Sequence, residues 1–349
     1  MFTREQTKQV KVGNLTLGGN NKVYVQSMLN APANDFNANI KQAVELEKAG
    51  CEIIRVSVPN TDTVKLIYKL KEAVNIPVVA DIHFDYKLAV LSAEAGVDKI
   101  RINPGNIGSI DGINQVLKIC NSKNIPIRIG VNSGSIEKEY LEKYGVCARS
   151  LFLSAKKHID IAERYDFDNL VLSLKASNVK IMFDAYKIAA TETKYPLHLG
   201  VTEAGTEKMG TIKSAAGIGG LLLLGLGNTI RVSLTDNPLK EIEAANNILK
   251  AVEIKQSGVK IVSCPTCGRT SINLIALAKE AEEYLNKVDK NITVAIMGCV
   301  VNGPGEAREA DIGIAGGNKE GLIFKKGKII KKVPEKDLLK ELFKEIDNL

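Results

Sequence analysis

The sequence predicts an α/β protein with an N-terminal (β/α)8 barrel of the TIM type, followed by a small α+β domain that carries cysteines. Three observations predict this architecture. Short β-branched runs alternate with amphipathic stretches over roughly the first 255 residues, which implies parallel strands joined by right-handed helical crossovers. Eight such units fit the size of a closed barrel. The pattern then changes, and two cysteine motifs follow.

The eight predicted strands are rich in Val, Ile and Leu and end in polar residues. They cover residues 23–28, 53–58, 78–83, 99–103, 127–132, 170–175, 197–202 and 230–234. The predicted helices carry apolar residues at helical spacing and cover residues 40–49, 63–73, 86–95, 112–120, 155–165, 179–191, 209–224 and 238–252. An open doubly wound sheet is the competing fold. It is expected to carry a glycine-rich turn after its first strand, and residues 29–32 contain no glycine.

The second block has a different order of elements, so we divide the chain into a barrel over residues 1–255 and a cysteine-bearing domain over residues 256–349. The predicted elements of the second domain are a strand at 259–263, a helix at 271–287, strands at 292–297 and 311–315, a hairpin at 322–332 and a helix at 335–346. Both cysteine motifs directly follow predicted strands, so the loops of this domain carry the thiols.

Composition excludes several classes of protein. With 45% hydrophobic and 25% charged residues the chain is an ordinary globular one. It has no apolar run of about 18 residues and no secretory signal, so we expect no membrane span and a cytoplasmic location, where six cysteines stay reduced. The net charge of +7 is spread along the chain without interleaved aromatic residues, so we expect no nucleic-acid partner.

Basic side chains recur near the carboxyl ends of the predicted barrel strands. In a barrel, inward-pointing residues at these ends face the catalytic mouth. The cations are Arg55, Arg101, Arg128, Lys175 and Arg231, and the carboxylates available to them are Asp81 and Glu203. Two carboxylates do not neutralise five buried cations, so we infer an anionic ligand with several oxygens and expect a diphosphate. The alternative is that these side chains point outward and form surface pairs.

Further polar residues accompany the cations at the strand ends. They are His83, Asn103, Asn132, Thr202 and Ser233. His83 lies two residues after Asp81, so we assign it a functional role, whereas His158 and His198 are interpreted as structural. The glycine-rich stretch 217–227 lies within and after a helix, so it predicts close helix packing and not a phosphate loop.

Cys264, Cys267 and Cys299 form a candidate metal site, while Cys51, Cys120 and Cys147 are isolated. Structural zinc needs a fourth soft ligand, and all three histidines lie far upstream. A redox disulfide between Cys264 and Cys267 leaves Cys299 unexplained. Three thiolates with an oxygen ligand or an open position suit a [4Fe–4S] cluster with one exchangeable iron. Glu306 follows the rigid turn at 303–305 and is the candidate oxygen ligand.

At Cys-Pro-Thr-Cys-Gly-Arg-Thr (264–270) and Gly-Cys-Val-Val-Asn-Gly-Pro-Gly-Glu-Ala (298–307), the sequence closely resembles the 4-hydroxy-3-methylbut-2-enyl diphosphate synthases of the non-mevalonate isoprenoid pathway. Further matching stretches cover residues 25–28, 81–84, 101–106, 128–135, 200–205 and 229–235. The resemblance spans nearly the whole chain. The chain resembles the compact bacterial form of this family, which has two domains.

The resemblance implies a role for each candidate residue. Cys264, Cys267, Cys299 and Glu306 would ligate the [4Fe–4S] cluster. Proton delivery would fall to Glu203 and His83, with Glu306 also near the chemistry. The substrate diphosphate would be bound by Arg55, Arg101, Asn103, Arg128, Asn132, Lys175, Thr202, Arg231 and Ser233. The family also implies a head-to-tail homodimer in which the cluster of one subunit caps the barrel of the other.

The implied reaction is the two-electron reductive ring opening and dehydration of 2-C-methyl-D-erythritol 2,4-cyclodiphosphate to (E)-4-hydroxy-3-methylbut-2-enyl diphosphate. Nothing in the sequence binds NAD or flavin, so a flavodoxin or ferredoxin would bring the electrons. One alternative is a non-redox barrel transferase that acts on a phosphorylated substrate and carries a structural zinc domain. Another is an electron carrier joined to a binding module, although such carriers normally have a fourth cysteine.

Overall fold

A computed structural model of the chain describes residues 1–103, 110–255, 258–299, 307–317 and 319–349. The chain divides into two compact units, Met1–Ile254 and Lys255–Leu349, and each is described by itself.

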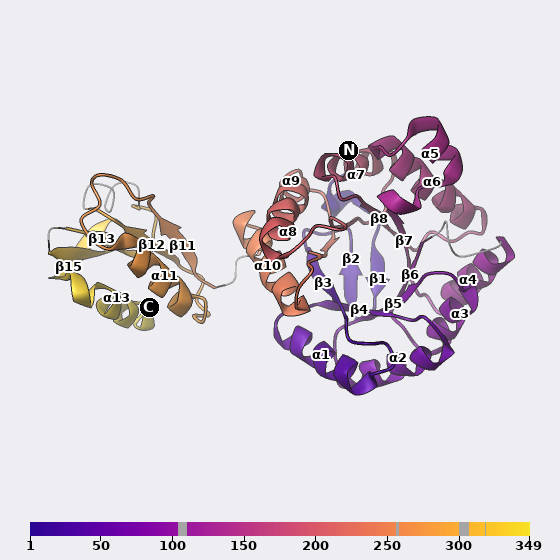
Figure 1. Cartoon of the computed structure of the whole chain (residues 1–349), viewed down its shortest axis with the longest axis horizontal. Helices are drawn as coiled ribbons and strands as arrows, with labels where there is room; N and C mark the ends of the chain where they lie inside the picture. Colours follow the sequence, from indigo (N-terminus) through magenta and orange to yellow (C-terminus); the bar gives the residue numbers. More distant parts are fainter. Residues whose placement is uncertain (104–109, 256–257, 300–306, 318) are drawn as a thin grey trace. The chain divides into compact units, whose positions relative to one another are not determined.

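The first unit is a parallel eight-stranded barrel enclosed by helices (Figure 1), so the predicted fold is confirmed. Its strands are paired in the order β8-β7-β6-β5-β4-β3-β10-β9. A parallel bridge between Leu172 and Leu197 closes the ring. The strands are β3 (Tyr24–Met28), β4 (Ile53–Ser57), β5 (Val78–Ile82), β6 (Lys99–Ile102), β7 (Ile127–Asn132), β8 (Leu170–Lys175), β9 (His198–Leu199) and β10 (Thr229–Ile230).

Several of the surrounding helices begin at a side chain that accepts a hydrogen bond from the first helical turn. Asn60 accepts from the backbone N–H of Thr63, and Asn178 accepts from that of Ile181. Such caps satisfy N–H groups that have no partner inside the helix. The helices are α1 (Phe36–Lys48), α2 (Thr61–Ala73), α3 (Tyr86–Glu94), α4 (Ile110–Ser122), α5 (Lys138–Tyr144), α6 (Ala148–Arg164), α7 (Val179–Glu192), α8 (Glu207–Ser214), α9 (Gly220–Leu223) and α10 (Pro238–Ala251).

A hairpin that the sequence did not predict closes the amino-terminal end of the barrel. Its strands β1 (Val10–Val12) and β2 (Leu15–Leu17) are antiparallel and lie behind the centre of the ring in Figure 1. Val12 and Leu17 are fully buried and pack in one apolar cluster with Ile53, Val79 and Val171 of the barrel wall. This cluster blocks that end, so the barrel is open to a ligand only at the carboxyl ends of its strands.

The last two barrel strands and two helical regions differ from the predictions. β9 and β10 have two residues each and are shorter than predicted, and Glu203, which follows β9, has a left-handed φ of 51°. Residues 138–144 form an unpredicted helix, α5. The predicted helix 209–224 is divided by a π-helical turn, Ala215–Gly219. Gly217 packs closely there, since a Cβ on it would lie 2.4 Å from the Met182 Cε.

The second unit is a five-stranded sheet in the order β11-β12-β13-β14-β15, parallel from β11 to β13 and antiparallel beyond. One face of the sheet packs against both helices, where the Tyr284 and Phe343 rings stack at 3.8 Å. Its elements are β11 (Lys260–Ser263), α11 (Leu274–Leu285), β12 (Thr293–Met297), β13 (Ile312–Gly316), β14 (Glu320–Lys325), β15 (Lys328–Pro334), the 3-10 turn Glu335–Asp337 and α13 (Leu338–Asp347).

None of the helices in the described part of the chain is both long enough and apolar enough to cross a membrane.

Candidate active site

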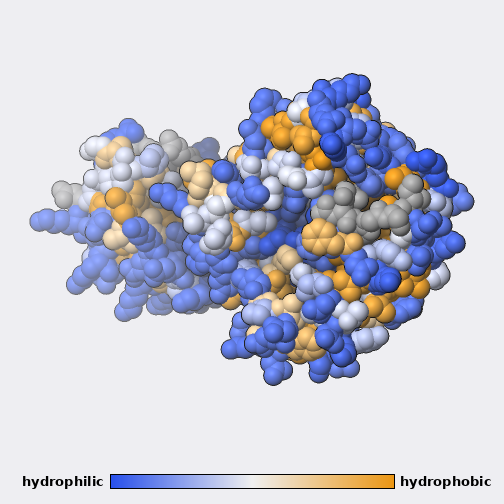
Figure 2. Space-filling model, turned by 45° about the vertical axis from the view of Figure 1, so that its right-hand side comes forward, coloured by the Kyte–Doolittle hydropathy of each residue, from blue (hydrophilic) through white to orange (hydrophobic). Residues whose placement is uncertain are grey.

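The barrel mouth is built on three neighbouring strands that place charged residues side by side. Asp81 on β5 is in register with Arg101 on β6, and Arg101 is in register with Arg128 on β7. Because alternate residues of a strand face the same side, all three point into the barrel, as does Val79, which lies two residues before Asp81 and packs in the apolar cluster at the closed end. In Figure 2 hydrophilic residues gather in a hollow on the barrel face that is turned toward the viewer.

Asp81 is the central acceptor of this cluster. It accepts a hydrogen bond of 3.0 Å from Arg101 Nη1, and Arg55 Nη2 and His83 Nε2 each lie 3.6 Å from its carboxylate. Burial alone would raise the pKa of Asp81, but Arg55 and Arg101 lower it well below its usual value. Asp81 is therefore ionised and shared between two guanidinium groups.

Arg231 has its own partner, Glu241 of α10, which the sequence interpretation missed. Arg231 donates from Nε and Nη2 to the two Glu241 oxygens at 3.2 and 3.0 Å. Glu241 also accepts from the Ser27 hydroxyl at 2.8 Å and from the Leu234 N–H at 3.1 Å. A buried carboxylate with four donors holds the Arg231 guanidinium in one orientation, so Glu241 is a positioning residue for the mouth.

The remaining cations of the mouth, Arg128 and Lys175, have no carboxylate partner among the described residues. Arg128 is 1% exposed, and its Nε and Nη1 have no hydrogen-bond partner among the described residues. Lys175 is buried and forms no ion pair with a described carboxylate. Burial, with Arg231 and Arg128 nearby, lowers the pKa of Lys175 well below its usual value. Among the described residues, two carboxylates, Asp81 and Glu241, thus pair with three of the five cations, which is the imbalance that an anionic ligand would correct.

Two glycines make room for these cations. A Cβ on Gly200 would lie 2.7 Å from Lys175 Nζ, and one on Gly130 would lie 2.9 Å from Arg101 Nε. Contacts of that length are too short for carbon, so any larger residue would displace the charged groups. The barrel wall is therefore shaped to hold the ammonium and guanidinium groups inside the mouth.

The other predicted residues lie around this cluster with fewer contacts. Asn103 is buried, and its Oδ1 has no partner among the described residues. The His83 side chain is 42% exposed. Glu203 is exposed and has no described ion pair, while Asn132, Thr202 and Ser233 are half-buried. The structure thus joins Arg55, Asp81, Arg101 and His83 by direct contact, and it leaves Glu203 without one.

A deeper polar layer also lies inside the barrel. Sequence reasoning did not single out Lys99 and interpreted His198 as structural. Lys99 is fully buried and two residues below Arg101 on the same strand, and its Nζ has no hydrogen-bond partner among the described residues. His198 is fully buried, with Nδ1 2.8 Å from the Thr229 hydroxyl. The charged beginning of strand 99–103 was the available signal for Lys99.

The thiols lie along the edge of the second sheet that is formed by the carboxyl ends of its parallel strands. β11 and β12 are parallel neighbours, so Cys264 and Cys299, which follow them, share that edge. Cys264 Sγ accepts a hydrogen bond of 3.2 Å from the Gly298 N–H, and Cys267 is exposed. All six cysteines are free. Glu306, the fourth predicted ligand, lies outside the described residues.

The described residues contain no group of three His, Cys, Asp or Glu side chains close enough to hold a metal ion. The donor set nevertheless suits an iron–sulfur cluster, because soft thiolates lie at one sheet edge and a backbone N–H already points to a sulfur.

A barrel whose mouth holds excess buried cations, joined to a unit with three thiols in its loops, defines an enzyme that binds an anionic substrate. Comparison with known proteins is more specific. The family model described as "GcpE TIM-barrel domain" matches residues 7–246, and "GcpE protein C-terminal domain" matches residues 260–348. The chain belongs to the GcpE family.

Relatives of known name match this chain over nearly its whole length. A protein of Clostridium perfringens named 4-hydroxy-3-methylbut-2-en-1-yl diphosphate synthase (flavodoxin) is 56% identical over 349 residues, which is 100% of both chains. A protein of the same name from Fusobacterium nucleatum is 55% identical and covers 97% of this chain and 96% of its own. These relatives confirm the predicted family and enzyme class, and they do not support the zinc transferase alternative.

Among solved structures, dihydropteroate synthase of Xanthomonas albilineans has a TM-score of 0.51 at 10% identity. It covers 70% of this chain and 98% of its own. At that identity the likeness concerns the barrel fold alone.

Proposed function

We propose that this chain catalyses the reductive ring opening and dehydration of 2-C-methyl-D-erythritol 2,4-cyclodiphosphate to (E)-4-hydroxy-3-methylbut-2-enyl diphosphate. In this reaction two electrons enter, the ring bond between carbon and a phosphate oxygen breaks, and a hydroxyl group leaves as water after protonation. The single observation that carries the proposal is the excess of buried cations at the barrel mouth, which matches a cyclic diphosphate.

The cations have two roles in this proposal. Arg128 and Lys175 bind the diphosphate oxygens directly, because they are the buried cations at the mouth that have no carboxylate partner among the described residues. Arg101, Arg55 and Arg231 are already held by Asp81 or Glu241, so their remaining N–H groups are oriented before the substrate binds. Fixed donors of this kind stabilise the negative charge that develops on the phosphate as its bond to carbon breaks.

Proton delivery is assigned to His83 and Glu203. His83 lies beside Asp81, with its Nε2 3.6 Å from the Asp81 carboxylate, and its side chain is partly exposed at the barrel mouth. Glu203 lies directly after Thr202 on the loop that follows β9, and its left-handed φ of 51° is uncommon for a residue other than glycine. Such strain occurs at functional sites, which supports a role for this carboxyl in protonating the leaving hydroxyl.

The metal site is assigned to Cys264, Cys267, Cys299 and Glu306 as ligands of a [4Fe–4S] cluster. When bound, such a cluster supplies electrons one at a time. The Gly298 N–H donates a hydrogen bond to Cys264 Sγ, which would help to orient that ligand.

The proposed electron donor is a flavodoxin, as the names of the relatives indicate, with ferredoxin as the second candidate. We further propose a cytoplasmic location, which the six free cysteines support. A head-to-tail homodimer is also proposed, on the resemblance to the family.

The proposal is tested by reconstituting the full chain with iron and sulfide under anaerobic conditions. We expect iron and inorganic sulfide near four each per chain, a broad visible absorption band, and turnover of the cyclic diphosphate with a reduced viologen dye. A colourless protein that instead retains stoichiometric zinc and shows no turnover would support the non-redox transferase.

A further inference from the structure

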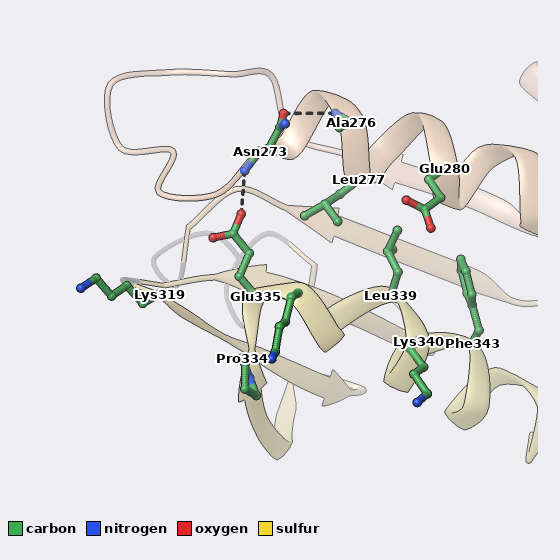
Figure 3. A pocket seen from close by; sticks show the side chains of 11 residues that line it. Asn273, Ala276, Leu277, Glu280, Lys319, Pro334, Glu335, Leu339, Lys340 and Phe343 are labelled. Carbon is green, nitrogen blue, oxygen red and sulfur yellow. Dashed lines mark hydrogen bonds between the residues drawn. The ribbon is translucent and has the colours of Figure 1, made fainter.

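The second unit has an open groove that the proposed reaction does not use. It lies between α11 and the segment formed by the 3-10 turn and α13, and its volume is about 780 Å³ (Figure 3). Leu277, Leu339 and Phe343 supply its apolar surface, and Ala276 is exposed on the α11 side. The groove is thus a surface feature with an apolar floor between two helices.

Charged side chains surround this floor. Lys319, Lys336 and Lys340 line the groove, and none of them forms an ion pair with a carboxylate of the described residues. The acidic residues that line it are Glu280 and Glu335, and Glu335 already accepts a 3.0 Å hydrogen bond from the Asn273 N–H. The rim therefore presents three free ammonium groups to a partner.

The sequence around the groove is also unusually basic. Residues 319–344 contain nine lysines and four acidic residues, an excess of five, while the excess for the whole chain is seven. Lysines on an edge strand such as β15 also prevent unwanted strand pairing. That explanation does not reach the rim, because Lys336 and Lys340 lie after β15 and Lys319 lies before β14.

One end of the groove lies beside the carboxyl ends of the parallel strands, where the thiols are. Asn273 comes six residues after Cys267 and begins α11. Lys319 follows β13, which is parallel to β12 and so ends at the same edge as the strands before Cys264 and Cys299. Gly316 at the end of β13 packs against Gly298, since a Cβ on it would lie 2.7 Å from the Gly298 carbonyl oxygen.

We propose that this groove, with its lysine rim, is the docking site for an acidic electron-donor protein. The inference rests on the proposed function, which requires a donor such as flavodoxin. Lysines attract an acidic surface and guide its approach, while a small apolar floor gives the limited contact that is typical of transient redox complexes. Docking at this end of the domain places the donor near the thiols, and electron transfer slows steeply with distance.

The test uses the full chain with its cluster reconstituted anaerobically, and a recombinant flavodoxin with an acidic surface as the probe. Binding of the oxidised flavodoxin is measured by calorimetry at low salt for the parent and for Lys336→Glu/Lys340→Glu. We expect the Kd to rise about tenfold or more, because two attractive charges become repulsive. The KM for flavodoxin in the turnover assay should rise in parallel, while turnover driven by reduced viologen stays unchanged.

The matched control is Lys287→Glu/Lys328→Glu, which makes the same change of charge in the same domain. Lys287 follows the carboxyl end of α11, just before β12, and Lys328 begins β15, which runs in the same direction as β13. Both therefore lie where the parallel strands begin, at the end of the domain opposite the thiols. The Kd of this control should change less than about threefold, because screened charges far from a contact contribute little. Equal effects in both double variants would overturn the proposal.

Ala276→Arg separates docking in the groove from general attraction to a basic surface. The new side chain adds positive charge but fills the groove, and arginine is well tolerated in an exposed helix. We expect weaker binding; tighter binding would overturn the proposal. This variant also serves as the test if the double variant does not fold.

Two further outcomes distinguish the rival explanations. A change of oligomeric state in Lys336→Glu/Lys340→Glu, measured by sedimentation, would show that a second copy of this chain occupies the groove and would overturn the proposal. Failure of the parent to turn over the cyclic diphosphate with reduced viologen would reject the proposed function instead, and the Kd values would still decide whether flavodoxin docks here.

Discussion

Arg128 carries an uncompensated positive charge in the interior of the barrel. Two of its three guanidinium nitrogens have no partner among the described residues, although the side chain is 1% exposed. Natural interiors avoid this arrangement because an unpaired buried charge is costly. This cost is explained if Arg128 serves to bind the ligand, because a bound diphosphate supplies the missing hydrogen-bond acceptors.

This interpretation predicts opposite effects on binding and stability. Arg128→Met should raise the KM for the cyclic diphosphate roughly ten- to hundredfold, since a hydrogen bond to a charged group contributes about 1.5–3 kcal/mol. The melting temperature of the ligand-free protein should stay the same or rise, because an apolar chain of similar length replaces an unpaired charge. Steady-state kinetics and calorimetric melting measure the two effects.

The control for Arg128 is Arg149→Met, which removes an exposed arginine that pairs with Glu192 at 2.7 Å. It should leave both quantities nearly unchanged. A fall in stability of Arg128→Met without a change in KM would show that Arg128 has a structural role, and the diphosphate assignment would be wrong.

Glu203 is the second residue whose assignment can be tested by itself. Glu203→Gln should retain the visible spectrum of the reconstituted cluster and lose roughly a hundredfold or more in kcat, because it removes a proton donor without changing size. Glu207→Gln is the matched control, since Glu207 begins α8 and pairs with Lys240 at the surface. Unchanged turnover in Glu203→Gln would remove Glu203 from its assigned role.

At the scale of elements, the β1–β2 hairpin determines which end of the barrel is open. Leu17 is fully buried in the cluster that closes the amino-terminal end, whereas Leu15 on the same strand is only half-buried. We expect Leu17→Ala to lower the free energy of unfolding of the barrel by about 2–5 kcal/mol and Leu15→Ala to lower it much less. Urea unfolding followed by circular dichroism measures both, and equal effects would show that the hairpin is not a packed part of the core.

The elements also show what a sequence can predict. Strands such as β5 (Val-Val-Ala-Asp-Ile) and β7 (Ile-Arg-Ile-Gly-Val-Asn) are recognisable because Val and Ile, which are enriched in strands, make up half or more of each. The strands of the β1–β2 hairpin have three residues each, which is too short for a period of two to be detected. Helix α5 was missed because its sequence Lys-Glu-Tyr-Leu-Glu-Lys-Tyr is mostly charged and has no buried residue.

The same limits apply to the site. Arg101 and Arg128 were predictable because strand order alone places their side chains at the mouth. Glu241 was not, because an acidic residue in the first turn of a helix usually only complements the helix dipole. The tertiary structure is needed to see that Glu241 is 3% exposed and bonded to both Arg231 and Ser27.

At the scale of the whole molecule, the proposed chemistry is divided between two units. The proposed diphosphate site lies in Met1–Ile254 and the thiols lie in Lys255–Leu349, so the proposed reaction would require a barrel and a cluster unit to meet. They can belong to one chain or to two chains. The proposed head-to-tail homodimer requires the second arrangement.

Complementation between two defective chains distinguishes these arrangements. Arg128→Met disables the barrel and Cys299→Ser disables the cluster, and the two chains are co-expressed with different affinity tags so that the heterodimer can be isolated. If each site combines a barrel and a cluster from different subunits, the heterodimer contains one intact site and one doubly defective site. Its turnover at low substrate should then be about half that of the parent dimer, by symmetry.

The matched control is a heterodimer of Arg128→Met and Glu203→Gln, in which both defects lie in the barrel. Every site then has a defective barrel in either arrangement, so this heterodimer should be inactive at the same substrate concentration. An inactive heterodimer of Arg128→Met with Cys299→Ser, in a protein that is dimeric by sedimentation, would mean that each chain uses its own cluster. The head-to-tail arrangement would then be wrong, while the assignments of the diphosphate site and of the cluster ligands would be unaffected.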